Sequence, residues 1–271
     1  MSTLDVSIAT FRPEGIERVE KLLLPPREGV RYIVSWQEHE NAAIPESIKN
    51  RDDVDVWRLD VKGVSHNRNN SLKHCNGDII LIADDDIIYE KDAFNKILET
   101  FEKRPQMDLG LFMMNYPNPK IYPDKEVEVG VPFPKYYYGS AVEIALRRNK
   151  IGSLNFWPGI GPGNDYLLTG EDEFFLISAI RKGLKSHFIP VLIGSHPALS
   201  TGNRVNDGIL RGSGFLIQTI YPFTSILRIP LKAFRVSSQK SYPFWRALRQ
   251  LTCGALYSLV KLKSIPKNYR W

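Results

Sequence analysis

The sequence predicts a three-layer α/β fold, in which helices cover both faces of a mainly parallel sheet, followed by a basic helical extension. Three observations lead to this prediction. Strand and helix patterns follow one another in the order β-α-β-β-α-β-α over residues 6–104, which favours a mainly parallel sheet. The run at residues 79–83 is apolar without alternation, as is typical of a strand buried on both faces. The end of the chain is strongly basic, whereas the rest is acidic.

The expected elements follow in order along the chain. Strands are expected at residues 6–11, 30–36, 54–59, 79–83, 109–114 and 188–193, and helices at 15–24, 65–75, 92–104 and 171–182. Pro25 should end the first helix, since proline has no amide hydrogen to donate. Ser65 is a candidate N-cap of the second helix. Residues 125–131 suit a hairpin, and residues 140–148 fit either a strand or a helix.

The composition fits one large globular domain, alone or with an extension. The chain has 271 residues, of which 43% are hydrophobic and 24% are charged. Cys75 and Cys253 form no metal-binding or redox motif, which fits a reducing compartment. No signal-peptide pattern is visible, and no apolar run reaches the roughly 18 residues of a membrane-spanning helix. We therefore expect a cytoplasmic location.

The net charge of +6 hides an asymmetry between the two parts of the chain. Residues 208–271 contain eleven Lys or Arg and no Asp or Glu, so that residues 1–207 carry a net charge of −5. This favours a domain at 1–207 and a separate basic extension at 208–271. Six apolar residues of the extension recur at helical spacing: Trp245, Leu248, Leu251, Ala255, Leu259 and Leu262. That helix either faces a core or lies on an anionic membrane. No nucleic-acid motif is present, so we expect no nucleic-acid partner.

Three consecutive carboxylates, Asp84, Asp85 and Asp86, follow the buried strand at residues 79–83. The carboxyl ends of strands in an open α/β sheet are where ligands bind. Because the three carboxylates repel one another, a cation should compensate them, and a hard divalent metal with oxygen ligands is the natural candidate. The alternative is a solvated acidic turn or the start of a helix.

A second acidic cluster opens the helix expected at residues 171–182. Glu171, Asp172 and Glu173 suit a first helical turn because of the helix dipole, or one of them serves as a general base. His196 follows the last strand and is either a metal or phosphate ligand or a structural residue. The glycine-rich segment 156–163 lacks the Lys-Ser/Thr of a phosphate-binding loop and favours a flap over a site.

These features together resemble glycosyltransferase family 2, the nucleotide-sugar-dependent enzymes of the GT-A fold. Four segments carry the resemblance: residues 6–12, the segment from Gly63 to Asn69 with Arg68, the Asp84–Asp86 triplet at the place of an Asp-x-Asp motif, and Gly170-Glu171-Asp172. One segment departs from the family. Where many members have an Asp-Gly-Ser stretch after the second strand, this chain has Gln37 and Glu38, and one of these would replace the usual carboxylate contact to the base.

The resemblance implies an inverting, metal-dependent glycosyltransferase that moves a sugar from a UDP-linked or other nucleoside-diphosphate donor to a hydroxyl of a glycan or lipid-linked acceptor. It implies Mn²⁺ or Mg²⁺ held by Asp86, with Asp84 and His196 as further ligands. Asp172 would be the general base, and Glu171 would orient the acceptor or the base. The implied nucleotide-sugar contacts are Thr10, Phe11, Arg12, Gln37, Arg68, Asn69, Asp84 and Asp85.

The implied role is cell-surface polysaccharide biosynthesis, with the basic extension on the inner face of the plasma membrane. Two other functions stay open at this point. A sugar nucleotidyltransferase also uses paired Asp residues and a metal, although residues 10–15 do not form its glycine-rich basic loop. A non-catalytic relative that binds a nucleotide sugar or a lipid is the second.

Overall fold

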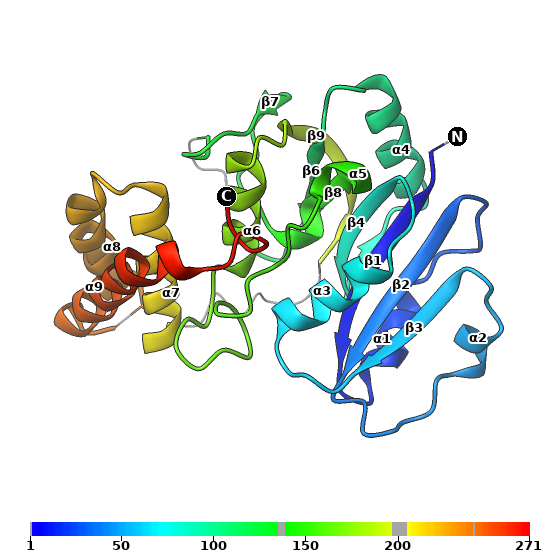
Figure 1. The fold of residues 1–271 in the computed structure, drawn as a ribbon, viewed down its shortest axis with the longest axis horizontal. Helices are drawn as coiled ribbons and strands as arrows, with labels where there is room; N and C mark the ends of the chain where they lie inside the picture. The colour runs from blue at the N-terminus through cyan, green and yellow to red at the C-terminus, as the bar shows by residue number, and fades with distance from the viewer. Residues whose placement is uncertain (1, 135–138, 197–204, 241) are drawn as a thin grey trace.

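The computed structural model describes residues 2–134, 139–196, 205–240 and 242–271. It consists of a twisted mixed sheet with helices on both faces and a helical C-terminal region beside it (Figure 1). This confirms the predicted three-layer α/β fold with its helical extension. The sequence also predicts a polar, mobile loop at residues 200–204 and a loop at 115–138, and all of the first and part of the second lie outside the described residues.

The sheet has its parallel strands on one side and mixed strands on the other, in the order β3-β2-β1-β4-β8-β6-β9-β5, with β7 paired to β9. The strands are β1 (Leu4–Phe11), β2 (Val30–Gln37), β3 (Val54–Leu59), β4 (Ile79–Asp84), β5 (Ile88–Tyr89), β6 (Leu109–Asn115), β7 (Val127–Glu128), β8 (Ile144–Arg147) and β9 (Ser186–Ser195). The long pairings β1 with β2, β1 with β4, β2 with β3 and β6 with β9 are parallel. The antiparallel pairings, made by β5, β7 and β8, are short.

Helices lie on both faces of the sheet and in the C-terminal region (Figure 1). The longer ones are α1 (Gly15–Leu22), α3 (Val64–His74), α4 (Ala93–Lys103), α6 (Glu171–Arg181), α7 (Asp207–Ile220), α8 (Ser225–Lys240) and α9 (Phe244–Lys261). Short helical segments are α2 (Glu46–Lys49), α5 (Arg148–Ile151), η1 (Ala141–Glu143) and η3 (Leu262–Ser264).

The side-chain alternation of β4 divides the core between the two faces. Ile79 and Leu81 pack with apolar residues of α1 and α4, whereas Ile80 and Ile82 pack with those of α3 and α6. All four are essentially fully buried. Because successive side chains of a strand point to opposite faces, a strand covered on both sides has to be apolar at every position.

The C-terminal region is a three-helix unit that docks on α6 through α7. Phe215 and Leu216 of α7 share a buried cluster with Phe174 and Ile177 of α6. Helices α7 and α9 approach closely because each presents a glycine to the other. A Cβ on Gly214 would lie 1.9 Å from the carbonyl oxygen of Leu251, and one on Gly254 would lie 1.9 Å from that of Arg211. No helix among the described residues is long and apolar enough to cross a membrane.

Three local predictions were wrong or incomplete. Residues 125–131 do not form a hairpin, since Val127 and Glu128 pair instead with residues 187–188 of β9. Ser65 is not the N-cap of α3, because the helix begins one residue earlier, after Gly63. The Ser65 hydroxyl instead donates to the carbonyl of Ile160 at 3.3 Å. Residues 140–148 contain both a short helical turn and a strand.

Candidate active site

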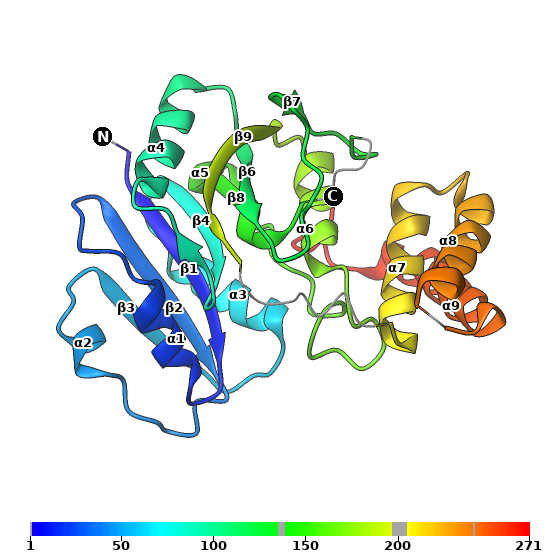
Figure 2. The ribbon, with the colours of Figure 1, turned by 180° about the vertical axis from the view of Figure 1, so that it is seen from behind.

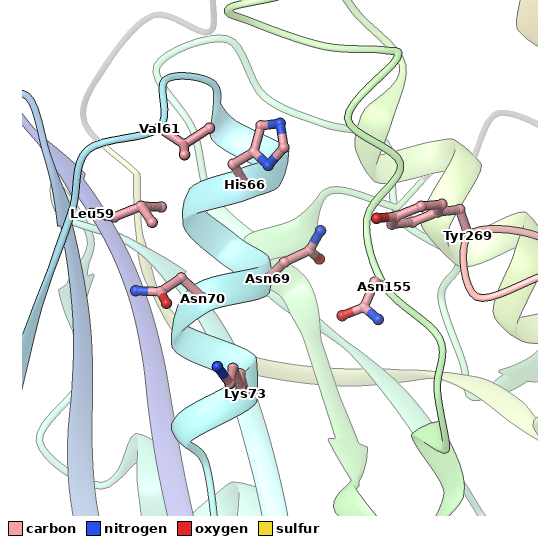
Figure 3. Close-up of a pocket in the computed structure, with 8 residues that line it drawn as sticks. All are labelled: Leu59, Val61, His66, Asn69, Asn70, Lys73, Asn155 and Tyr269. Atoms are coloured by element: carbon pink, nitrogen blue, oxygen red, sulfur yellow. The ribbon is translucent and has the colours of Figure 1, made fainter. Parts of the chain in front are cut away.

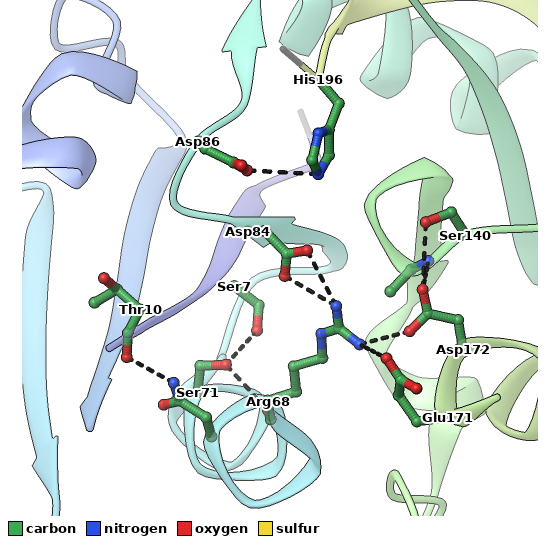
Figure 4. A network of polar contacts seen from close by, with 12 residues as sticks. Ser7, Thr10, Arg68, Ser71, Asp84, Asp86, Ser140, Glu171, Asp172 and His196 are labelled. Atoms are coloured by element: carbon green, nitrogen blue, oxygen red, sulfur yellow. Dashed lines mark hydrogen bonds and ion pairs between the residues drawn. The ribbon is translucent and has the colours of Figure 1, made fainter. Parts of the chain in front are cut away.

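The two acidic clusters meet at the carboxyl edge of the parallel strands. Strand β1 has β2 on one side and β4 on the other, so the chain order reverses there, which is the usual ligand position in an open α/β sheet. Asp84 ends β4, and Asp172 lies in the first turn of α6, and both side chains point to the same place (Figure 4). The sequence placed these residues 88 positions apart, and the fold brings them to one cation.

That cation is Arg68 of α3, whose side chain bridges the clusters. One terminal nitrogen donates to both carboxylate oxygens of Asp84 at 2.9 and 3.2 Å. The other donates to Asp172 at 2.5 Å and lies 3.6 Å from Glu171 (Figure 4). Although burial lowers the pKa of Arg68, the charges of Asp172, Asp84 and Glu171 raise it well above its ordinary value. One guanidinium thus faces three carboxylates, which leaves this part of the site electronegative.

Asp172 is held from a second side by the backbone of η1. Its second oxygen accepts the amide N–H of Ala141 at 2.9 Å and the hydroxyl of Ser140 at 3.3 Å (Figure 4). The side chain nevertheless stays 18% exposed, so a substrate hydroxyl can reach it. A carboxylate that is oriented by three donors and still accessible suits a general base.

The neighbours of Asp172 on α6 have perturbed acidities. Burial raises the pKa of Glu171 well above its ordinary value, and the charge of Asp172 raises it further, while Arg68 lowers it. Burial also raises the pKa of Glu173 to about 7. Titratable groups with such shifts concentrate at functional sites, although structural ion pairs produce them too.

The middle carboxylate of the triplet, Asp85, faces the interior rather than the site. Arg18 of α1 binds it through two nitrogens at 3.0 and 2.8 Å, and the Thr10 hydroxyl donates to it. Burial raises the pKa of Asp85, and these donors offset the effect only in part. Asp85 thus fixes the end of β4 to β1 and α1. Thr10 is fully buried by the same contact, so its side chain is not at the surface of the pocket.

Asp84 and Asp85 each form hydrogen-bonded ion pairs with an arginine, whereas the cationic partner of Asp86 is a more distant histidine. Oδ1 of Asp86 lies 3.5 Å from Nε2 of His196, which itself stacks near Tyr116. Both Oδ1 of Asp86 and Nδ1 of His196 are buried without a hydrogen-bond partner among the described residues. Burial raises the pKa of Asp86; His196 lowers it, and the other two carboxylates raise it.

This chemistry fits a divalent cation beside Asp86. In the described parts of the chain, no three His, Cys, Asp or Glu side chains are grouped as a complete metal site. Mg²⁺ and similar ions are usually held by one or two carboxylates together with substrate phosphates, so a complete protein cage is not required. The buried, unpartnered oxygen of Asp86 is the observation that favours a cation at this position.

The predicted nucleoside contacts lie at the ends of β1 and β2. Phe11 is 47% exposed, and the guanidinium of Arg12 lies 5.3 Å from the centre of its ring. Arg12 adopts a left-handed backbone (φ 66°), which is uncommon outside glycine and recurs at functional sites. The Gln37 amide donates to the carbonyl of Gly63 at 2.9 Å and holds the loop before α3. Trp36 is fully buried, so it packs in the core and does not stack on a ligand.

Asn69 connects α3 to the glycine-rich segment. Its amide donates to the carbonyl of Phe156 at 2.8 Å and accepts the N–H of the same residue at 2.7 Å. The Phe156 ring packs under the Arg68 guanidinium and stacks on Phe175, with centroids 4.1 Å apart. Both hydrogen-bonding groups of the Asn69 amide are therefore used to position the segment that supports Arg68.

The glycine-rich segment is packed against the site. Gly161 (φ 99°) would place a Cβ 2.9 Å from the Glu171 Cβ, and Gly163 (φ 91°) would place one 2.6 Å from the Cα of Gly63. Only residues without a side chain allow these approaches. The segment thus packs against Glu171 and Gly63, and its role as a flap stays a prediction.

A surface groove with a volume of about 380 Å³ lies on the other side of α3. Figure 3 shows His66 and Lys73 of α3 beside it, with Leu59 on one flank and Tyr269 on the other. Arg68 is not among its lining residues. The groove is therefore distinct from the Arg68 network.

Several contacts of the site were not predicted from the sequence. Arg18, Ser140 and Ala141 hold carboxylates of the two clusters, and Phe156 supports Arg68. Arg18, Ser140 and Ala141 belong to no motif, Phe156 only begins the glycine-rich segment, and each lies more than 30 residues along the chain from its partner. One indication of such contacts is visible in the sequence. The two acidic clusters carry unbalanced negative charge, which predicts a nearby cation but does not identify the residue that supplies it.

Comparison with known proteins finds one family and several solved structures that the chain resembles. Residues 37–154, from the end of β2 to the loop after α5, match the family model "Glycosyl transferase family 2". None of the curated proteins matches the sequence.

Solved structures resemble the whole chain in fold. S. aureus TarS 1–349 in complex with UDP-GlcNAc aligns with a TM-score of 0.60 and 17% identity, over 98% of this chain and 78% of that one. The same protein in complex with UDP aligns with a TM-score of 0.58 and 16% identity, over 89% and 72%. The mannosyltransferase PcManGT from Pyrobaculum calidifontis, in complex with GDP-Man and Mn²⁺, aligns with a TM-score of 0.56 and 13% identity, over 96% and 88%. At such identities the likeness shows the GT-A fold.

Proposed function

We propose that this chain, whose residues 37–154 match the model of glycosyltransferase family 2, is a glycosyltransferase that moves a sugar from a UDP-linked donor to a hydroxyl group, with inversion at the anomeric carbon. The observation that carries the proposal is the position of Arg68. Its guanidinium binds Asp84 on the donor side and Asp172 at the start of α6. Arg68 thereby fixes the donor-side carboxylate, Asp84, and the candidate base, Asp172, on two sides of its guanidinium.

In the proposed reaction, the acceptor oxygen attacks the anomeric carbon directly. A new bond forms between these atoms while the bond from the carbon to the diphosphate oxygen breaks, and the electron pair leaves with the nucleoside diphosphate. Asp172 accepts the hydroxyl proton on a carboxylate oxygen. The Ala141 N–H and Arg68 keep that carboxylate in place. A single displacement inverts the configuration of the sugar.

Mn²⁺ or Mg²⁺ would be held by Asp86, with Asp84 and His196 beside it. When bound, such an ion neutralises negative charge on a diphosphate. Support comes from the unpartnered oxygen of Asp86. The mannosyltransferase that shares the fold was solved with Mn²⁺.

The donor pocket would be formed at the ends of β1 and β2. Phe11 and Arg12 would contact the nucleoside, and Asp84 and Arg68 the ribose and phosphate side. Gln37 would take the place of the usual carboxylate at the base, and Asn69, Thr10 and Asp85 would act by positioning these groups. The related folds were solved with UDP, UDP-GlcNAc and GDP-Man, which supports a nucleotide sugar.

The acceptor would be a glycan or a lipid-linked glycan in cell-surface polysaccharide biosynthesis. We assign transfer to residues 1–207 and membrane association to residues 208–271, whose eleven Lys or Arg are accompanied by no Asp or Glu. Anionic lipid on the cytoplasmic side of the plasma membrane would attract this region.

Thermal denaturation with ligands tests the proposal. The melting temperature is measured with UDP, UDP-sugars and GDP-Man, with and without Mn²⁺, since a ligand that binds the native state raises it. We expect the largest rise with a uridine ligand in the presence of Mn²⁺. Asp86→Ala should abolish the Mn²⁺-dependent part, whereas Asp52→Ala, which removes an exposed carboxylate before β3, should not. No rise with any nucleotide would refute the donor site.

A further inference from the structure

The outer side of α8 exposes a group of large apolar side chains. Five of them are between 66% and 95% exposed: Phe223 in the preceding turn, and Ile226, Leu227, Leu231 and Phe234 on the helix. Helix α8 lies at the end of the molecule that is farthest from β1 to β3 (Figures 1 and 2). Single exposed apolar residues are normal, but a contiguous group of this size indicates a surface that binds a protein, a ligand or a membrane.

The residues of α8 fall into three sectors around the helix. Ile229, Ala233 and Val236 are buried, in one cluster with Ala247 and Leu251 of α9. At roughly 100° per residue, the exposed apolar sector from Ile226 to Leu231 spans about 140° and includes Pro230. The basic residues lie between these two sectors: Arg228, Lys232 and Arg235. The helix is therefore apolar on two sides, and only one of these sides has a partner among the described residues.

Helix α9 has exposed apolar residues too, but its outer side is mixed. Trp245 and Leu256 lie on the same side of the helix as Arg249 and Thr252, which are also exposed. A charged and a polar residue therefore interrupt the apolar surface in its middle. The uninterrupted sector of α8 is the better candidate for contact with an apolar phase.

We propose that Phe223 and the exposed apolar sector of α8 insert into the headgroup region of an anionic lipid bilayer. A helix that lies in the membrane interface has this composition: large apolar residues on one side and Lys or Arg beside them. Arg228 and Arg235 are positioned to meet lipid phosphates. The complete lack of Asp and Glu after Asp207 gives the whole region the complementary charge.

The position of α8 relative to the site gives the membrane contact a role. Lys232 lies close enough to Glu173 of α6 for the two charges to affect each other, and Glu173 is next to Asp172 in sequence. At roughly 100° per residue, Lys232 lies on a different side of α8 from the exposed apolar sector, so that sector faces away from α6 and is free to meet a membrane. Insertion would hold the whole chain at a membrane surface, where a lipid-linked acceptor would be found, and this role rests on the proposed function; the vesicle test measures the membrane contact separately from donor binding.

Vesicle co-sedimentation of the full chain tests the proposal. Vesicles of phosphatidylcholine alone are compared with vesicles that contain roughly one quarter phosphatidylglycerol. We expect the protein to bind the anionic vesicles, and we expect added salt to weaken this binding. The triple variant Leu227→Ser, Leu231→Ser and Phe234→Ser should lower the partition coefficient by about tenfold or more, because it removes most of the inserted apolar surface. Phe223→Ser, which lies outside the helix, should lower it less.

A matched triple variant on α9 is the control: Leu256→Ser, Leu259→Ser and Val260→Ser. It removes a similar exposed apolar area and should leave binding within about twofold of wild type. Equal binding by the α8 variant, or equal loss in both variants, would refute the proposal. A third result would also refute it: the wild-type protein binds neither kind of vesicle and forms a dimer, and the α8 variant is a monomer. A second copy of the chain would then cover the apolar sector of α8. UDP-sugar hydrolysis without acceptor should be unchanged in both variants, which separates this test from that of the donor site.

Discussion

Replacement of Arg68 by methionine should destabilise the protein by about 3 kcal/mol. Methionine keeps the unbranched stem but removes the charge that faces Asp84, Asp172 and Glu171. Loss of one partner of a buried ion pair generally costs about 3–5 kcal/mol. Two features place the expected loss for Arg68→Met at the lower end of that range. The Asp84 side chain is 31% exposed and can be rehydrated, and Asp172 keeps its bond from Ala141.

The loss of unfolding free energy caused by Arg68→Met should increase with pH. Burial raises the pKa of Glu171, and Arg68 opposes this, so the variant should have a still higher pKa at Glu171. A carboxyl group with a raised folded-state pKa contributes stability below its unfolded pKa and loses it as the pH rises through the folded value. The substitution should therefore cost more near pH 7.5 than near pH 5.

Urea unfolding followed by circular dichroism measures both effects. Arg31→Met is the matched control, because the Arg31–Asp55 pair has side chains that are 41% and 47% exposed. Such a surface pair is worth less than about 1 kcal/mol. If Arg68→Met is as stable as the control at both pH values, the bridge does not hold the two clusters together, and the geometric basis of the proposed function fails.

Three further changes have expected outcomes. Asp172→Asn should lower transfer by about a hundredfold to ten-thousandfold while the thermal shift by UDP persists, and a near wild-type rate would exclude it as the base. Gly161→Ala should destabilise by about 1–3 kcal/mol in urea unfolding, because of its φ of 99° and its contact with Glu171, whereas Gly130→Ala, with open space around it, should have little effect. Glu173 has a pKa of about 7, so its contribution to stability is lost as the pH rises through that value, and Glu173→Gln should flatten this part of the stability profile.

The fold was predictable because its strands and helices have strong local patterns. The apolar run at residues 79–83 became the central strand β4, and Phe174 and Ile177 gave α6 its buried side. The hairpin at 125–131 was wrong because β7 pairs with β9, about 60 residues away, and no local pattern encodes that partner. The number of C-terminal helices was also missed, since only α9 has an obvious apolar period.

The candidate site was predictable in its residue types but not in their pairing. Three adjacent aspartates look equivalent in the sequence, yet Asp84 binds Arg68, Asp85 binds Arg18 and Asp86 faces His196. These differences come from alternating side-chain directions at the end of a strand and from partners on three other elements. Tertiary structure alone decides which carboxylate stays available for a ligand.

The shared use of Arg68 has a thermodynamic consequence for the two substrates. Its guanidinium is bonded simultaneously to Asp84 and to Asp172, which the proposed function places on the donor side and on the acceptor side. A donor that draws Asp84 away from Arg68 changes how strongly Arg68 binds Asp172, and so changes the affinity for the acceptor. Linkage requires that the acceptor change the affinity for the donor by the same factor. In the proposed reaction, the two substrates would therefore be coupled through the side chain of Arg68.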